Sequence, residues 1–598
     1  MTPFWLIVAA LIAYAVAYWG YSRWYDRNVW RPEPSKTTPA HMYMDGIEFF
    51  PVSKYVLWGY QFKSVAALGP ILGPFIAITY GWLPALIWII LGNFFIGWLQ
   101  DYSAIMVSVK NDGKSFGPLT YEFMGSRARG VLLGFILFYL LIISAVFIFL
   151  ISLFWNIFPT TFSATIGMII AGVITGVLLF RMKVNVFVTT FIALIIAAIS
   201  IYLPSALPAL QTPKDFLGPW TLAFWAAVLI VILFIGAILP MPTFTQPVLY
   251  IAFYPAILAV ILIILGSLFS PITGIELLQP SFKTFYTEAA GPLWPMLFVA
   301  IACGAISGWH SLVGSGSTAK QIDIETDARP VGAGAMLSEG LLALASVAAF
   351  MVLSPDEAAV GNVGSWVAGS VRLTMPWLGG EAVKTFLATF FGLALVIYAL
   401  TVQWLVTRFW RTISSEVFGE SILGQRHVAT IIGLIIPWLF AVSGSWINLW
   451  LYFGGSNQLL AGLALMIATI FLAKIKRPTI YTLGPAVFMI VTTLAALLWE
   501  TWVFTRAVLT AKPLVRPPLN AFPSVALAMN GVFIAVGVIL FVLGLLMTRY
   551  TFSGFLSMRA GPSGGTPSAP SSTAVTRLDE GLSDDESEKV ELKPSEYT

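Results

Sequence analysis

Long apolar runs, separated by short segments rich in proline, glycine and charged residues, repeat along the whole chain. A helix needs about 20 mainly apolar residues to cross the hydrocarbon core of a bilayer, and on this criterion the sequence predicts about fifteen spanning helices. Membrane strands are short, alternating and closed into barrels, so strands fit these long continuous runs poorly. The predicted spans are 3–21, 55–80, 84–107, 131–156, 164–180, 184–203, 219–240, 247–268, 291–313, 331–353, 384–405, 428–442, 446–472, 480–502 and 523–547.

The distribution of basic residues predicts how these spans are oriented. The first run has no basic cluster before it and no small-residue cleavage site after it, so we interpret it as a span and not as a signal peptide. Lys and Arg concentrate in short cytoplasmic loops. If the N-terminus lies outside, most loop bases fall on the inside. The outside loops then hold only Lys214, Lys283, Arg372, Lys384, Arg506, Lys512 and Arg516. We therefore expect a multi-pass protein of the cell membrane with an external N-terminus and a cytoplasmic C-terminus.

Composition supports this class and excludes others. Hydrophobic residues make up 58% of the chain and charged residues only 10%, and the mean hydropathy is +0.87, which no water-soluble domain could accommodate. Cys303 is the single cysteine, so neither an intramolecular disulfide nor a thiolate metal cluster can form within one chain. Beyond Tyr550 the chain is rich in Pro, Gly and Ser and then acidic, which predicts a disordered tail without a catalytic role.

Two hydrophobic segments are interrupted by glycine and proline. The first reads Gly69-Pro-Ile-Leu-Gly-Pro74, and the second runs from Cys303 to Ser317 with glycine and serine where a lipid-facing helix would carry Leu or Ile. In the predicted topology they run in opposite directions, and each opens a run of five helices. Paired broken helices in inverted repeats indicate a binding site at the membrane midplane, where exposed N–H groups hold anions and exposed carbonyls hold cations. The alternative is that the glycines only permit close helix packing.

The predicted fold class is therefore an all-α polytopic membrane protein built around an inverted five-plus-five helix core with two discontinuous helices. The expected organisation follows the chain: a first helix and cytoplasmic linker (1–54), the first repeat (55–203), two inserted helices with their loops (204–290), the second repeat (291–473), additional C-terminal helices (474–548), and the disordered acidic cytoplasmic tail (549–598).

Several motifs occur in order between about residues 50 and 480, and together they resemble the carbon starvation protein A (CstA) family. They are Gly69-Pro-Ile-Leu-Gly-Pro74, Gln100-Asp101, Ser307-Gly-Trp-His310, Ser315-Gly-Ser-Thr318, Glu325-Thr-Asp-Ala-Arg329, Gly334-Ala-Met-Leu-Ser-Glu339 and Phe453-Gly-Gly-Ser-Asn-Gln-Leu-Leu460. The resemblance implies a transporter of short peptides or pyruvate, proton-coupled, produced in carbon starvation, and grouped with the amino acid-polyamine-organocation superfamily.

This chain departs from the family pattern at two places. A His-His pair precedes the first broken helix in the family, whereas Tyr60 and Gln61 stand here. An Asp precedes a Thr-Arg pair in a later helix of the family, whereas Trp404 occupies the acidic position here. If that Asp couples an ion in relatives, coupling in this chain differs or uses another acid.

Ionisable residues inside predicted spans are costly, by about 2.5 kcal/mol or more at a helix centre, so each is a functional candidate. Glu339 lies among Ala, Leu and Ser, and we expect it to bind and release a proton, or else to make a permanent interhelical hydrogen bond. Asp101 and His310 are the other proton-coupling candidates; histidine exchanges protons near neutral pH. Asp101 alternatively anchors a loop or pairs with a base. Lys63 could be that base, but we expect it to extend to the cytoplasmic interface.

The remaining candidates are uncharged contacts to a solute and a charged loop. Lys320 to Arg329 is dense in charge and is either a solvated cytoplasmic loop or an internal gate, with Lys320, Asp323, Asp327 and Arg329 as the gate residues. Buried amides need partners, so Asn457 and Gln458 contact either substrate or a neighbouring helix. The full set of predicted substrate-binding residues is Gly69, Pro70, Gly73, Ser307, Gly308, His310, Ser315, Gly316, Thr318, Asn457 and Gln458.

These observations favour a secondary active transporter that works by alternating access. We expect a small-molecule substrate (a peptide or pyruvate), protons or another cation, and the lipid bilayer as partners, with no nucleic acid, no cofactor, no metal and no catalytic residues. A channel or facilitator is the main alternative, although channels usually repeat a pore element around an axis. A membrane nutrient sensor is the other alternative. An enzyme is disfavoured because the sequence lacks a nucleophile motif such as Gly-x-Ser-x-Gly.

Overall fold

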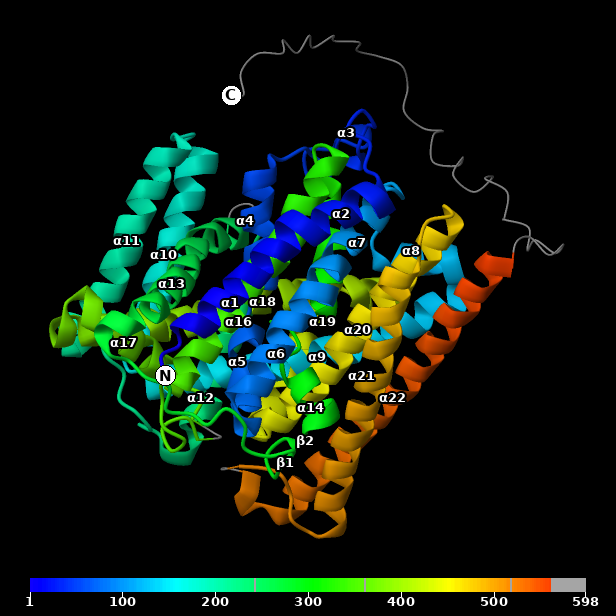
Figure 1. Ribbon diagram of the computed structural model, residues 1–598. Coiled ribbons are helices and arrows are strands. Elements are labelled where there is room, and N and C mark those ends of the chain that lie inside the picture. Colours follow the sequence, from blue (N-terminus) through cyan, green and yellow to red (C-terminus); the bar gives the residue numbers. More distant parts are fainter. Residues whose placement is uncertain (241–243, 360–361, 517–518, 561–598) are drawn as a thin grey trace, which may run out of the picture.

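The computed structural model is a bundle of membrane-length helices (Figure 1) and describes residues 1–240, 244–359, 362–516 and 519–560. Within this part, twelve helices are long and apolar enough to cross a membrane. The other three predicted spans are bent, broken or short. Residues 54–80 form two helices with a 47° bend, 293–316 form two shorter helices, and Arg426–Val442 is a single short helix. The predicted disordered tail (549–598) was wrong for its first residues, because α22 continues to Ala560, and the rest of it lies outside the described residues.

The elements follow the hydrophobic runs closely, because a helix satisfies its own backbone hydrogen bonds where lipid offers none. The α-helices are α1 (Phe4–Ala15), α2 (Arg23–Tyr25), α3 (Pro39–Met42), α4 (Lys54–Val65), α5 (Gly69–Ala77), α6 (Trp82–Gly92), α7 (Trp98–Val109), α8 (Phe116–Met124), α9 (Ser126–Ile157), α10 (Thr161–Gly176), α11 (Val186–Ala206), α12 (Thr221–Ile238), α13 (Thr245–Thr273), α14 (Leu293–Ala300), α15 (Gly308–Gly316), α16 (Gly334–Met351), α17 (Ser365–Leu378), α18 (Lys384–Phe418), α19 (Arg426–Val442), α20 (Trp446–Lys474), α21 (Ile480–Leu509) and α22 (Pro523–Ala560). Strands β1 (Tyr286–Thr287) and β2 (Gly291–Pro292) pair antiparallel.

Burial separates a core of helices from a periphery. The most apolar window of α20 is 94% buried, and α9, α16 and α18 also lie deep inside, whereas the corresponding window of α11 is only 22% buried. In Figure 1, α21 and α22 form one flank of the molecule, while α10 and α11 project at the opposite flank. The peripheral helices are apolar on their exposed faces, as lipid contact requires, so the core helices are the ones that can hold polar chemistry.

Among the α-helices that lie outside every predicted span, the longest is α17. Residues Ser365–Leu378 form α17, which packs between α16, α13 and α18. It has only 14 residues and contains Arg372 and Pro376, so it is too short and too polar for the length criterion. Arg372 pairs with Glu357 at 2.8 Å near the end of α16. The helix is therefore held by neighbours and not by its own hydropathy.

Candidate functional site

The two broken segments meet in the centre of the bundle. The chain unwinds between α4 and α5 at 66–68, and between α14 and α15 at 301–307. A Cβ atom on Gly69 would lie 2.3 Å from the Cβ of Cys303, and one on Gly73 would lie 2.7 Å from the Cα of Ile301. A Cβ atom on Gly304 would lie 3.2 Å from the Cα of Pro70. The glycines of the first segment thus allow its backbone to touch the break of the second.

Two neighbouring amides on α20 satisfy the free backbone groups at the second break. The backbone N–H of Trp309 donates to Asn457 Oδ1 at 2.9 Å, at the start of α15. Gln458 Nε2 donates to the carbonyl of Phe298 at 2.9 Å, at the end of α14. Asn457 Nδ2 also donates to Ser307 Oγ at 3.1 Å. The sequence left two alternatives for these amides, a contact with substrate or with a neighbouring helix. In this conformation they contact neighbouring helices.

The same break brings three ionisable side chains together, and we call Asp101, His310 and Glu339 the acid–histidine cluster. His310 on α15 lies between Asp101 on α7 and Glu339 on α16. Its Nδ1 is 2.8 Å from Asp101 Oδ2, and its Nε2 is 2.9 Å from Glu339 Oε2. All three side chains are fully buried. The three residues that the sequence predicts as proton-coupling sites therefore lie in contact with one another.

The cluster holds more acceptors than donors. The Asp101 contact is a hydrogen bond, whereas the Glu339 contact has ion-pair distance without hydrogen-bond geometry. Asp101 Oδ1 and both oxygens of Glu339 are buried and lack a hydrogen-bond donor among the described residues. Unsatisfied buried carboxylate oxygens are costly, which favours a proton on one of them. Each ring nitrogen faces a different acid, so an imidazole in this position can pass a proton between two helices.

Among the described residues, no group of three or more His, Cys, Asp or Glu side chains has the geometry of a metal site. Within the cluster itself, the two carboxylates occupy opposite sides of the imidazole, with each ring nitrogen already facing an oxygen. The donor set therefore suits proton transfer, whereas a metal would need a ring nitrogen and carboxylate oxygens converging on one point.

Lys63 lies in the last turn of α4, and its predicted extension to the interface was wrong. Its side chain is buried, and Nζ donates to Thr401 Oγ1 on α18 at 2.6 Å. The ammonium also lies 5.4 Å from the ring centre of Tyr398. Among the described residues it has no carboxylate partner, because Asp101 pairs with His310 instead. The side chain thus points to Thr401 and Tyr398 on α18, inside the bundle, and not to the interface.

The remaining predicted solute contacts surround this centre. A Cβ on Gly308 would lie 2.3 Å from the carbonyl of Asn457, so α15 approaches α20 closely there. Ser315 Oγ donates to the carbonyl of Ser311 within its helix, and Gly316 has ordinary spacing to Phe409. Thr318 Oγ1 donates to Gln61 Oε1. Gln61 thus ties α4 to the segment after α15.

The charged loop is held by ion pairs and a hydrogen bond to other parts of the chain. Asp323 lies 2.8 Å from His41 Nε2, Asp327 lies 3.6 Å from Lys54 Nζ, and Lys320 lies 2.5 Å from Glu48. The carboxylate of Glu325 is buried and lies 2.8 Å from Lys110 Nζ at the end of α7. The structure therefore brings Lys320 and Asp323 into contact with the linker before α4, and Asp327 into contact with the first residue of α4.

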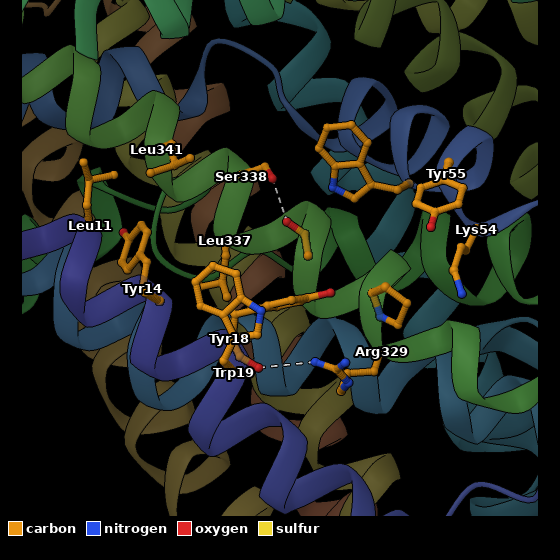
Figure 2. Close-up of a pocket in the computed structure, with 14 residues that line it drawn as sticks. Leu11, Tyr14, Tyr18, Trp19, Lys54, Tyr55, Arg329, Leu337, Ser338 and Leu341 are labelled. Carbon is orange, nitrogen blue, oxygen red and sulfur yellow. Dashed lines mark hydrogen bonds between the residues drawn. The ribbon is translucent and has the colours of Figure 1, made fainter. Parts of the chain in front are cut away.

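The fourth gate residue borders an open groove of about 610 Å³ between α1, the start of α4 and the start of α16 (Figure 2). The Arg329 guanidinium lies over the ring of Tyr18 and donates to its carbonyl at 3.3 Å. Leu11, Leu337 and Leu341 line the other end of the groove. None of the acid–histidine cluster lines this groove, so the groove and the buried cluster are separate features.

Sequence reasoning identified the members of the cluster but missed the environment of Lys63 and its contact with Thr401. One signal was present: Lys63 stands in an otherwise uncharged stretch shortly before the Gly69-Pro70 break. The contact itself joins residues 338 positions apart, which no local pattern can indicate.

The fold and the site define a multi-pass α-helical membrane protein with a buried, ionisable centre at two broken helices. The chain belongs to the carbon starvation protein CstA family, whose model matches residues 2–370 and 357–496. The resemblance noted from the motifs is thereby confirmed.

Individual relatives are distant but extend over much of the chain. The chain is 28% identical over 405 residues to the pyruvate/proton symporter BtsT of Escherichia coli K12, covering 65% of this chain and only about half (54%) of BtsT. It is 27% identical over 578 residues to the peptide transporter CstA of the same organism, covering 82% of this chain and 80% of that protein. The peptide transporter CstA of Bacillus subtilis 168 is 27% identical, with 83% of this chain and 90% of that protein covered.

Among solved structures, a manganese transporter of Eremococcus coleocola covers 86% of this chain and 99% of its own, at 15% sequence identity and a TM-score of 0.39. A likeness this low informs neither the cargo nor the helix arrangement of this chain.

Proposed function

We propose that this protein is a proton-coupled secondary transporter for the uptake of short peptides or pyruvate. The observation that carries the proposal is the acid–histidine cluster, in which His310 lies between two buried carboxyls from different helices. Intramembrane ionisable groups of this kind mark proton pathways. The names of the relatives, a pyruvate/proton symporter and peptide transporters, supply the solute classes.

Transport proceeds by alternating access around the two broken helices. In this proposal, residues 55–203 and 291–473 are inverted repeats, and rocking of one helix bundle against the other exposes the centre to each side in turn. The contact between Gly69 and Cys303 supports it, because it places both breaks at one point. The ion pairs of the loop 320–329 form the internal gate, and the predicted solute contacts from Gly69 to Gln458 line the route.

The test is uptake of pyruvate and of a dipeptide by the purified protein in liposomes with an imposed pH gradient. Wild-type protein should accumulate one of these solutes against its gradient, and a protonophore should abolish the accumulation. Glu339→Gln keeps the size of the side chain but removes a proton site. We expect this variant to keep solute exchange at equal pH and to lose proton-driven accumulation.

Glu500→Gln is the matched control, because Glu500 is also a buried carboxyl but pairs with Asn448 at 3.3 Å, away from the cluster. Unchanged proton-driven uptake in Glu339→Gln would refute the assigned role of the cluster. Downhill flux without accumulation in the wild type would instead identify a facilitator, and solute binding without any flux would favour a nutrient sensor.

A further inference from the structure

Lys63 is a buried cation without an acidic partner. Lysine is almost never fully buried unless it is paired, because an ammonium loses its hydration there. An ammonium has three N–H donors, and among the described residues one of them reaches Thr401. The ring of Tyr398 at 5.4 Å offers only a weak further interaction. In this conformation the charge of Lys63 is therefore undercompensated.

A second donor on the same turn also lacks an acceptor. Gln61 is fully buried and its Nε2 has no hydrogen-bond acceptor among the described residues. The acid–histidine cluster shows the opposite deficit, because three of its four unsatisfied atoms are carboxylate oxygens and only one, His310 Nε2, is a ring nitrogen. The end of α4 thus lacks hydrogen-bond acceptors, and a bound anion would supply them. The cluster lacks hydrogen-bond donors, and a bound proton would supply one.

Counting charge connects the two deficits. With Lys63 and His310 protonated and Asp101 and Glu339 ionised, the four groups sum to zero. An anion that binds alone would leave a net negative charge in a medium of low dielectric, and a proton that binds alone would leave a positive one. Binding both together returns the sum to zero, so each favours the other.

We propose that Lys63 binds the carboxylate of the transported solute, and that one proton on the acid–histidine cluster balances its charge. This inference deepens the proposed transport function and rests on it for the direction of coupling. The ligand class is a small monocarboxylate, held between α4 and α18. Thr401 then releases the ammonium or shares it with the solute. The obligatory partner in transport is a single proton, and the cycle with a monocarboxylate anion is electroneutral.

The experiment compares Lys63→Gln with wild type in liposomes, using pyruvate as the probe. Loss of a charge-assisted hydrogen bond should raise KM for pyruvate by about 10- to 100-fold. The KM of Lys63→Arg should lie between those of wild type and Lys63→Gln, because arginine keeps the positive charge but has a different shape. Lys283→Gln removes an exposed lysine, and its KM for pyruvate should equal that of wild type. An unchanged KM in Lys63→Gln overturns the inference.

Binding read by thermal shift separates this inference from the proposed function. Pyruvate should stabilise wild type, whereas pyruvamide, which lacks the carboxylate, should not. If carboxylates stabilise wild type through Lys63 but no proton-driven uptake occurs, the proposed function fails and the Lys63 site stands. Equal stabilisation by pyruvate and pyruvamide overturns the Lys63 site even if transport is proton-driven. If Lys63→Gln does not fold, Lys63→Arg and Thr401→Val replace it, and an unchanged KM in both overturns the inference.

Membrane potential gives an independent readout. At equal pH on both sides, an imposed potential should not drive pyruvate uptake by wild type, because the loaded and empty cores carry the same charge. Pyruvate uptake that becomes faster when a potential is imposed would contradict the transport of one proton with each monocarboxylate anion.

Discussion

Asn457 shows how a single side chain stabilises a broken helix. Its amide oxygen accepts from the N–H of Trp309 at 2.9 Å, and its amide nitrogen donates to Ser307 Oγ. The free N–H groups at a helix start need acceptors, and lipid supplies none. Tyr139 OH adds a third contact at 3.2 Å. The amide thus acts as an N-cap from a neighbouring helix.

Replacing Asn457 by Ala should therefore destabilise the protein by about 1–3 kcal/mol, since buried backbone groups lose their partner. Thermal unfolding of the purified protein should show a lower Tm. Asn448→Ala on the same helix is the control, because Asn448 caps no helix start and bonds Glu500 at 3.3 Å. A Tm of Asn457→Ala no lower than that of the control would contradict the capping role.

The contacts of Trp404 show what this side chain does at one of the two positions where the chain departs from the family resemblance. Its indole is fully buried, and its Nε1 lies where a Cβ of Gly236 on α12 would be only 2.2 Å away. The ring also contacts Phe244. At the position where the resemblance implies an acid, Trp404 thus packs against α12, and Gly236 leaves room for its ring. Buried acids close to the two breaks remain available at Asp101 and Glu339.

At the scale of elements, three arginines bind the end of α12. Arg408 Nη2 donates to the carbonyls of Gly236 at 2.7 Å and Leu239 at 2.6 Å. Arg411 donates to the carbonyl of Ala237 at 2.9 Å, and Arg426 to that of Ile238. The last carbonyls of a helix lack partners and carry partial negative charge, so guanidinium groups are favourable there. These contacts join α12 to α18 and α19.

The charged loop before α16 contains one ion pair that a charge swap can test. Lys110 Nζ and Glu325 Oε2 are 2.8 Å apart and largely buried, so breaking the pair leaves an uncompensated charge. Lys110→Glu should shift the equilibrium toward the cytoplasm-open state by about 10-fold or more, which is about 1.4 kcal/mol. The measurement is downhill efflux of preloaded pyruvate.

Adding Glu325→Lys to Lys110→Glu restores opposite charges and should return efflux toward the wild-type rate. Lys384→Glu is the control, because its pair with Glu381 is exposed and worth little. Equal efflux in all variants would show that the loop is a solvated segment and not a gate.

At the scale of the whole molecule, the orientation predicted from basic residues can be read with cysteine labelling. Cys303 is the only native cysteine and is buried, so background labelling should be low. Asp45 and Glu381 are exposed in loops that the prediction places on opposite sides. We expect a membrane-impermeant maleimide to label Glu381→Cys in intact cells and Asp45→Cys only in inside-out vesicles. The reverse pattern would invert the topology.

The sequence by itself determined the membrane class, the approximate extent of most spans, the positions of both helix breaks and the three members of the acid–histidine cluster, but not the burial of Lys63 and Glu500. These follow from hydropathy and backbone chemistry, which act over about one helix length. Only the tertiary structure decided which groups meet: His310 with Asp101, 209 positions apart, and Lys63 with Thr401. Such contacts depend on which face each helix turns to its neighbours, and that is fixed by the packing of many side chains at once.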